Sequence, residues 1–170
     1  MDLFTSFNGR ISRKGFWLGF LAMVAVAVVA GLVMLQISPV ASAGMNAAAS
    51  DGIMVMLVQI AMALVITYFW SAIIVKRLHD RGKSAMPWAI VFVAPGILLQ
   101  IMSIFEIGYS AEELAGTQIM IPGIGATVVT LVTVAVGLWM IVELGFLKGS
   151  PGDNAHGPSP LSETPATQAV

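Results

Sequence analysis

The apolar residues of this chain fall into four long stretches, at 16–37, 53–75, 88–105 and 119–142 or 119–147. An α-helix rises about 1.5 Å per residue, so the longer stretches match the thickness of a bilayer's hydrocarbon core, about 30 Å. Polar residues are concentrated in the segments between these stretches. The pattern therefore predicts an all-α integral membrane protein, a four-helix bundle whose helices cross the bilayer.

Two features within the stretches predict how the helices meet. Pro95 and Gly96 interrupt the third stretch and predict a kink or a break there. Small or weakly polar residues recur along the second and fourth stretches: Gln59, Ala63, Thr67 and Ser71, and Ala126, Thr130, Thr133 and Gly137. Such stripes usually let helices pack closely, with hydroxyl groups bonding across the interface. A pore lining is the alternative interpretation.

Two of the polar segments carry local structural signals. Residues 1–15 combine aromatic and basic side chains, which predicts a short helix lying on the membrane surface. The segment 106–118 is acidic, and Ser110 followed by Glu113 fits a helix capping box. We therefore expect a short helix in that loop as well.

The composition agrees with a membrane solvent. The chain is 58% hydrophobic and 10% charged, whereas soluble domains are about 25% charged. Four spans leave no room for a separate soluble domain, so residues 1–161 are predicted to form one membrane domain. Residues 162–170 are predicted to be a disordered tail. The chain has no cysteine, which excludes disulfides and thiolate metal sites.

All eight Lys and Arg residues fall on one side of the four-span pattern: Arg10, Arg13, Lys14, Lys76, Arg77, Arg81, Lys83 and Lys148. The two remaining loops carry only the acidic residues Asp51, Glu106, Glu112 and Glu113. Short cytoplasmic loops collect Lys and Arg, so both termini and the middle loop are predicted to face the cytoplasm. A basic inner face favours anionic lipid headgroups. This basic face is too small and too close to the membrane to suggest that the protein binds nucleic acid.

The start of the chain has one competing interpretation. A basic segment, an apolar run and Ala41-Ser42-Ala43 together resemble a cleavable signal peptide. The apolar core of a signal peptide is usually about 7–15 residues long, and this run is longer. The sequence therefore favours a retained membrane span.

Three polar motifs are predicted to meet on the cytoplasmic side, within 7–17, 76–84 and 148–160. The first contains Phe7, Gly9, Arg10, Arg13, Phe16 and Trp17; the second Arg77, Leu78, His79, Asp80, Gly82 and Ser84; the third Gly149, Gly152, Asn154, Gly157 and Pro160. In this order they resemble the bacterial inner-membrane family called domain of unknown function 805. The resemblance implies a multi-pass inner-membrane protein with no settled activity and no catalytic residues to transfer. The chain departs from the family's usual pattern at 85–88 and at His156.

The chemical signals in these motifs are incomplete. Gly82-Lys83-Ser84 is similar to the end of a phosphate-binding loop, but Arg77 stands where that loop needs glycine, and no strand precedes it. His79 and Asp80 are possible general bases, yet adjacent helical residues do not face each other. Metal binding by these two residues with Asp153 and His156 is weakly supported. We therefore predict no metal and no cofactor.

A structural network explains the same residues more simply. Asp80 is expected to accept hydrogen bonds from Arg10, Arg13 or Arg77 in bidentate geometry. Asn154 and its flanking glycines and prolines are expected to form a tight turn that docks against the middle loop. Cations that this network leaves unused are available for a phosphate headgroup.

Smaller parts of the network concern helix ends. Gly82 is predicted to end the second helix as a C-cap, and Ser84 to cap the third. Glu143 lies about one turn inside the membrane boundary if the fourth helix reaches 147. Its expected partner is then Lys76 or Arg77, and a carboxylate exposed to water is the alternative.

The sequence predicts a non-enzymatic membrane module whose basic cytoplasmic face binds anionic lipid or a protein partner, including a second copy of the chain. The residues predicted to carry this binding are Arg10, Arg13, Arg77, His79, Asp80, Arg81, Lys83 and Asn154. One alternative is a small oligomeric transporter or channel. Another is an enzyme acting on lipid headgroups, with His79 as base and Asp80 orienting it.

Overall fold

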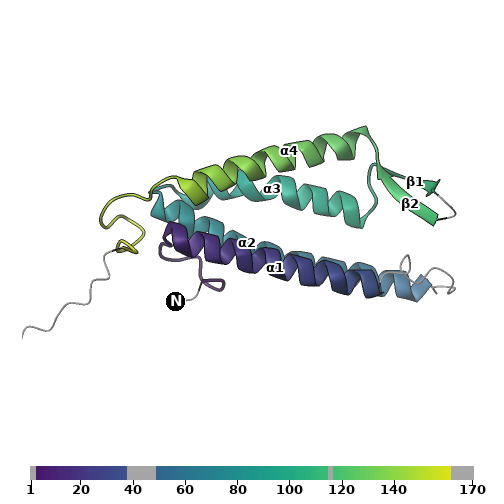
Figure 1. Cartoon of the computed structure of the whole chain (residues 1–170), viewed down its shortest axis with the longest axis horizontal. Coiled ribbons are helices and arrows are strands. Elements are labelled where there is room, and N and C mark those ends of the chain that lie inside the picture. Colours follow the sequence, from purple (N-terminus) through teal and green to yellow (C-terminus); the bar gives the residue numbers. More distant parts are fainter. Residues whose placement is uncertain (1–2, 38–48, 115–116, 162–170) are drawn as a thin grey trace, which may run out of the picture.

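The computed structural model describes residues 3–37, 49–114 and 117–161 (Figure 1). The elements in chain order are α1 (Arg13–Ile37), α2 (Ala49–Asp80), α3 (Ala85–Ile104), β1 (Tyr109–Leu114), β2 (Thr117–Pro122), α4 (Ile124–Met140) and the π-helix η1 (Ile141–Phe146). Four helical segments are long and apolar enough to span a membrane, the fourth formed by α4 and η1. The Ala41-Ser42-Ala43 segment of the competing signal-peptide interpretation and the predicted 162–170 tail lie outside the described residues.

The helices form two hairpins that meet at one end. Helix α1 packs on α2, α2 on α3, and α3 on α4, while η1 also packs on α1 and α2. Figure 1 shows the α1–α2 and α3–α4 pairs converging at the end near the N-terminus and diverging toward the β-hairpin. At most 17% of the residues in a span window are buried inside the chain. The bundle therefore presents most of its apolar surface outward, as a bilayer solvent requires.

The core of the chain lies where the hairpins converge. Its fully buried side chains come from α1, α2 and η1 and include Phe16, Ile73, Ile74, Leu78 and Leu144. Gly19 permits close packing of α1 on α2, because a Cβ at this position would lie 2.9 Å from the Ile73 Cδ1 atom. The best-packed part of the molecule is thus next to its polar motifs.

The acidic segment forms a β-hairpin, and the predicted short helix is wrong. Strands β1 and β2 pair antiparallel, with Ser110 opposite Ile121 and Glu112 opposite Ile119. The fourth span correspondingly begins at Ile124 and not at the predicted 119. Proline disfavours helical dihedrals in the residue before it, so Pro122 keeps Ile121 extended. Cross-strand pairing then outweighs the local capping-box signal.

Two further expectations about helices are wrong. Residues 3–12 form turns and extended chain, and helix α1 begins only at Arg13. Helix α3 runs through Pro95 without a break, so the predicted break is wrong there, and its non-helical dihedrals are at Met86, next to its start; the alternative prediction of a kink at Pro95 stays a prediction. The Thr133 hydroxyl of α4 lies 3.2 Å from the Pro95 carbonyl and 2.8 Å from the Val129 carbonyl. The small-residue stripe of α4 therefore serves packing against α3 at this position.

Replacing Thr133 with valine is expected to destabilise the α3–α4 pair by about 0.6 kcal/mol, the usual contribution of a hydrogen bond between membrane helices. The matched control is Thr130→Val, because the Thr130 hydroxyl bonds only the Ala126 carbonyl of its own helix. The measurement is the unfolding midpoint of both variants in detergent. Equal midpoints would show that the contact to Pro95 contributes nothing.

Candidate functional site

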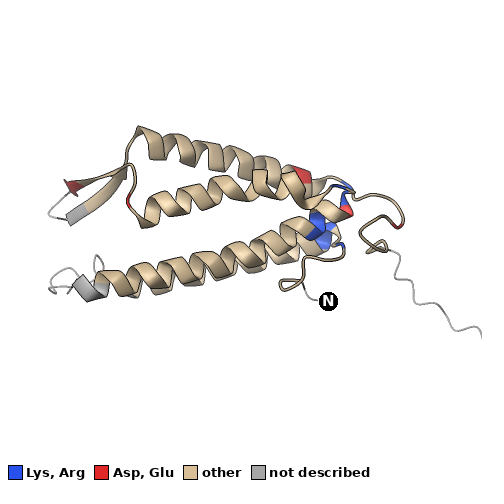
Figure 2. Cartoon of the chain, turned by 180° about the vertical axis from the view of Figure 1, so that it is seen from behind, with Lys and Arg blue, Asp and Glu red and all other residues tan. Residues whose placement is uncertain are grey.

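Three segments that are distant in sequence meet at one end of the bundle. We call this the basic end, and it comprises residues 3–14, 76–84 and 143–161. Figure 2 shows Lys and Arg gathered here, while the far hairpin carries only acidic charge. The meeting of these segments was predicted from the charge pattern, and the hydrogen bonds below confirm it.

Asp80 is the centre of a buried ion triad at the basic end. Its Oδ1 atom accepts bonds from Arg10 Nε at 3.2 Å and Arg10 Nη2 at 3.1 Å, and its Oδ2 atom accepts one from Arg77 Nη1. The side chains of Arg10, Arg77 and Asp80 are only 1%, 1% and 5% exposed. Buried charges persist only when they are paired and hydrogen-bonded. The expected network around Asp80 is therefore present, with two of the three predicted arginines.

Arg10 uses its remaining donors to hold the chain after η1. Its Nη1 atom bonds the carbonyls of Gly152 at 2.8 Å and Gly157 at 3.2 Å, and its Nη2 atom bonds the Ser150 carbonyl at 2.9 Å. The backbone carbonyl of Asp80 accepts the Ser150 N–H at 2.7 Å. Residues 149–157 are thereby fastened to the end of α2.

The π-helix turn presents a row of backbone carbonyls to side chains. Arg77 donates to Leu144 O and Leu147 O, both at 2.6 Å. The other three acceptors in the row are Gly145 O for Trp17 at 3.2 Å, Phe146 O for Arg13 at 3.4 Å and Lys148 O for Arg81 at 2.5 Å. The last carbonyls of a helix have no partners within it. Five consecutive carbonyls, 144–148, are satisfied here by side chains from α1 and the end of α2.

A second ion cluster lies on another side of the basic end. The Glu143 Oε1 atom is 3.0 Å from Arg81 Nη2 and 2.6 Å from Lys83 Nζ. The Lys83 ammonium also lies 4.3 Å from the centre of the Trp88 ring. The expected pairing of Glu143 with Lys76 or Arg77 is wrong. Lys76 instead donates to the Leu3 carbonyl at 2.7 Å.

The turn after α2 explains why Glu143 has these partners. Gly82 has a φ of +69°, its N–H bonds His79 O at 3.0 Å, and the Lys83 N–H bonds Leu78 O at 2.9 Å. This is a Schellman motif, so the predicted glycine C-cap is confirmed. It brings Lys83 back toward η1. Ser84 occupies the N-cap position of α3, as predicted, but its side chain makes no capping bond.

The turn at Asn154 docks on the same loop, as predicted. The Asn154 Nδ2 atom donates to His79 O at 3.0 Å and to Ser150 Oγ at 2.9 Å. The rings of His79 and His156 are stacked, with centres 3.9 Å apart and planes 3° apart. His79 Nδ1 lies 3.2 Å from Gly9 O.

This geometry separates His79 from Asp80 chemically. The carboxylate of Asp80 faces two arginines, and the ring of His79 faces His156, so the two do not form a base and its orienting acid. Among the residues that the structure describes, no three His, Asp or Glu side chains are placed to hold a metal ion.

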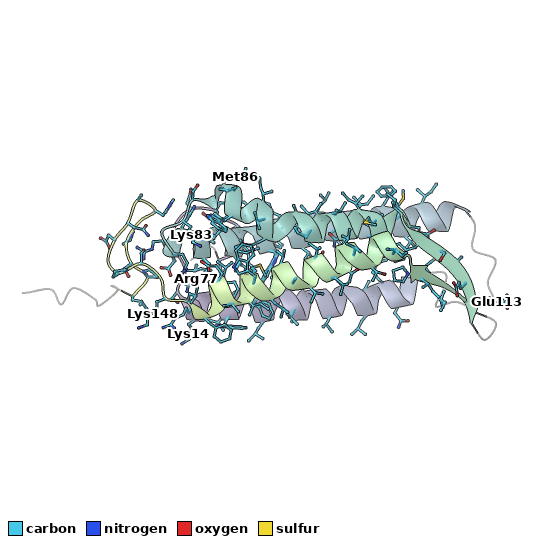
Figure 3. All side chains as sticks on the ribbon, turned by 90° about the horizontal axis from the view of Figure 1, so that it is seen from above. Lys14, Arg77, Lys83, Met86, Glu113 and Lys148 are labelled. Carbon is cyan, nitrogen blue, oxygen red and sulfur yellow. The ribbon has the colours of Figure 1, made fainter. Side chains whose placement is uncertain are left out.

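Three exposed cations remain beside an open hollow of about 750 Å³. Arg13 and Lys14 start α1, and Lys148 follows η1. All three line the hollow, together with Ser150, Pro151, Pro160 and Leu161. Figure 3 shows Lys14 and Lys148 near each other at the basic end, apart from Lys83. Neither Lys14 nor Lys148 has an ion pair with another described residue.

The family described as "Protein of unknown function (DUF805)" matches residues 4–158 of this chain. The chain belongs to the DUF805 family. It is 29% identical over 163 residues to "Uncharacterized protein YiiR" of Escherichia coli (strain K12), covering 89% of this chain and 84% of the relative. It is 30% identical over 103 residues to "Inner membrane protein YhaH" of the same strain, covering 61% of this chain and 76% of the relative. No solved structure matches it.

The DUF805 match covers residues 4–14, 76–84 and 143–158 of the basic end, and with the four apolar helices it makes this chain a multi-pass membrane protein. Sequence reasoning named the residues of the ion triad and the docked turn. It expected Lys14 to lie toward headgroups, but its set of candidate ligand residues left out both Lys14 and Lys148, although each lies at the boundary of an apolar stretch. Their position at these boundaries could have indicated lipid contact, because cations at the end of a membrane span commonly contact headgroups.

Proposed function

We propose that this DUF805 protein is a non-enzymatic inner-membrane module whose basic end lies in the cytoplasm and binds anionic lipid headgroups. The name of YhaH supports the inner membrane, and the confinement of cations to one end supports the orientation. The main support is that the basic end satisfies its buried charges internally and still keeps three exposed cations, Arg13, Lys14 and Lys148.

The proposal divides the basic residues into two groups. Arg10, Arg77 and Asp80 direct their charged atoms at each other and at backbone carbonyls, so we assign them to holding the fold. Of the predicted ligand residues, Arg13 is exposed and makes one long bond, to the Phe146 carbonyl at 3.4 Å, so we assign it to headgroup binding together with the exposed Lys14 and Lys148. His79, Arg81, Lys83 and Asn154 make contacts within the chain and are assigned to the first group.

The two rival functions have less support. No Lys, Arg, Asp or Glu lies between Asp51 and Lys76, between Lys83 and Glu106, or between Glu113 and Glu143. Ion-coupled transporters usually carry ionisable residues within their spans. A headgroup enzyme based on His79 and Asp80 lacks the contact that such a pair requires. The further partner predicted besides lipid is a second copy of the chain or another membrane protein, and we assign it to the exposed helix faces.

The orientation can be tested by cysteine labelling, since the chain has no native cysteine. We expect Glu112→Cys in the hairpin to react with a membrane-impermeant maleimide on intact spheroplasts. Lys148→Cys should react only after permeabilisation. The reverse pattern would place the basic end outside and contradict the proposal.

Lipid preference can be tested by tryptophan quenching, because Trp17 and Trp88 lie near the basic end. Brominated phosphatidylglycerol is expected to quench more strongly than brominated phosphatidylcholine in vesicles of matched composition. The difference should decrease with added salt, which screens exposed charges. Equal quenching by the two lipids would count against the lipid part of the proposal.

A further inference from the structure

The hollow between the start of α1 and the chain after η1 is more than a charged surface. We infer that it is a discrete site for one anionic phospholipid, with the phosphate at Arg13, Lys14 and Lys148. The glycerol backbone then lies against Pro151 and Leu161. This inference rests on the proposed function and adds to it a fixed place and a stoichiometry of one.

The charge of the hollow suits a phosphate group. The three cations come from two separate segments and converge on one opening. The acid in its lining is Asp80, which Arg10 and Arg77 already neutralise. The nearby Asp153 is exposed, and its Oδ1 atom accepts the Ser159 N–H at 2.9 Å. Positive charge therefore exceeds negative charge around the hollow, as a phosphate-bearing ligand requires.

The size and walls of the hollow favour a lipid over free phosphate. A volume of about 750 Å³ lies within the range of small-molecule sites, about 300–1,000 Å³, and far exceeds a single phosphate group. Pro151, Pro160 and Leu161 give it apolar walls, and Leu161 is 83% exposed. A phosphate group alone would leave these walls in water, whereas a glycerol backbone and the first acyl carbons would cover them.

The surroundings of the hollow provide a path for acyl chains. Phe146 is 61% exposed, and its ring packs edge-on against Trp17 with centres 5.5 Å apart. Leu18 and Leu147, the sequence neighbours of Trp17 and Phe146, are also exposed. Aromatic side chains at this level are typical of the membrane interface. A lipid held by its phosphate can therefore direct its chains along this apolar seam.

The part of the wall formed by residues 149–152 is held in place by hydrogen bonds within the chain. Arg10 and Asp80 fix it through the bonds to Ser150 and Gly152. A preformed wall lowers the ordering cost of binding. We therefore expect a saturable site in place of diffuse attraction.

The test is native mass spectrometry of the full chain, released from detergent micelles with phosphatidylglycerol titrated in. Wild-type protein is expected to retain one phosphatidylglycerol at concentrations where phosphatidylcholine does not bind. Lys148→Gln should weaken binding about fivefold, and Lys14→Gln with Lys148→Gln about thirtyfold, given about 1 kcal/mol for each cation near a membrane surface. The charge-matched control is Lys83→Gln, whose ammonium is paired with Glu143 outside the hollow. It is expected to bind like wild type.

The possible results separate this inference from the proposed function. Equal weakening by Lys148→Gln and Lys83→Gln would overturn the discrete site, while a preference for phosphatidylglycerol would still support the proposed function. Displacement of the lipid by millimolar glycerol 3-phosphate or inorganic phosphate would assign the site to a soluble phosphate and overturn the lipid occupant. No preference for phosphatidylglycerol over phosphatidylcholine in either assay would overturn both. Lys14 and Lys148 are exposed, so we expect their variants to fold normally. The thermal unfolding midpoint of each variant, Lys83→Gln included, checks this.

Discussion

Asp80→Ala is expected to destabilise the protein by about 3–5 kcal/mol, the usual cost of leaving buried partner charges uncompensated. The substitution leaves the guanidinium groups of Arg10 and Arg77 facing each other in a site where both are almost fully buried. It does not remove the backbone carbonyl that accepts the Ser150 N–H. The loss therefore measures the carboxylate alone.

The measurement for Asp80→Ala is the unfolding midpoint in detergent, together with limited proteolysis of the segment after η1. We expect the midpoint to fall and cleavage between 148 and 161 to become faster, because Arg10 loses the acid that positions it against Ser150 and Gly152. The control for the midpoint is Asp153→Ala, which removes an exposed carboxylate from the same end. It does not serve as a control for the proteolysis, because Asp153 accepts the Ser159 N–H within the cleaved segment. An unchanged midpoint for Asp80→Ala would show that the ion triad does not hold the basic end together.

Gly149→Ala is expected to be the other severe substitution, with a cost of about 1–3 kcal/mol from overpacking. An ideal Cβ at position 149 would overlap the carboxylate of Asp80, approaching all three of its terminal atoms within about 3.0 Å. The carboxylate cannot retreat, because Arg10 and Arg77 hold it from both sides. Either the triad or the segment after η1 must move.

The matched control for this substitution is Gly137→Ala, where nothing lies within 4 Å of an added Cβ. Alanine at that helical position is expected to be neutral or slightly stabilising, since glycine is the weaker helix former. The measurement is again the midpoint in detergent, combined with proteolysis of the segment after η1. If the two alanine variants behaved alike, the close approach of Gly149 to Asp80 would have no energetic consequence.

These two predictions test one structural idea, that Asp80 and Arg77 connect three parts of the chain through few atoms. Arg77 reaches the carbonyls of Ile11, Leu144 and Leu147, and Arg10 reaches the turn beyond them. Charged donors are roughly twice as strong as neutral ones, so two arginines can order many backbone carbonyls. The exposed cations are left for external ligands, which is the division of roles behind the proposed function.

Much of the fold could be predicted from apolar run length, because a helix must be long enough to cross the hydrocarbon core. The β-hairpin was missed because Ser110 and Glu113 satisfy a local helix signal, and pairing with Ile119 and Ile121 is not local. The continuity of α3 through Pro95 was not predicted, because whether a proline breaks a helix depends on the packing around it and not on the local sequence.

The sequence by itself determined the number of spans, the collection of cations at one end and the glycine that ends α2, since each follows from local composition or local dihedral preference. Only the tertiary structure decided which charged side chains are buried and paired within the chain. Arg10 and Arg13 are three residues apart, and the local sequence does not distinguish their roles. Arg10 is nevertheless buried in the ion triad, whereas Arg13 is exposed beside the hollow. The reason is that pairing and burial depend on segments more than sixty residues away, and no local pattern contains that information.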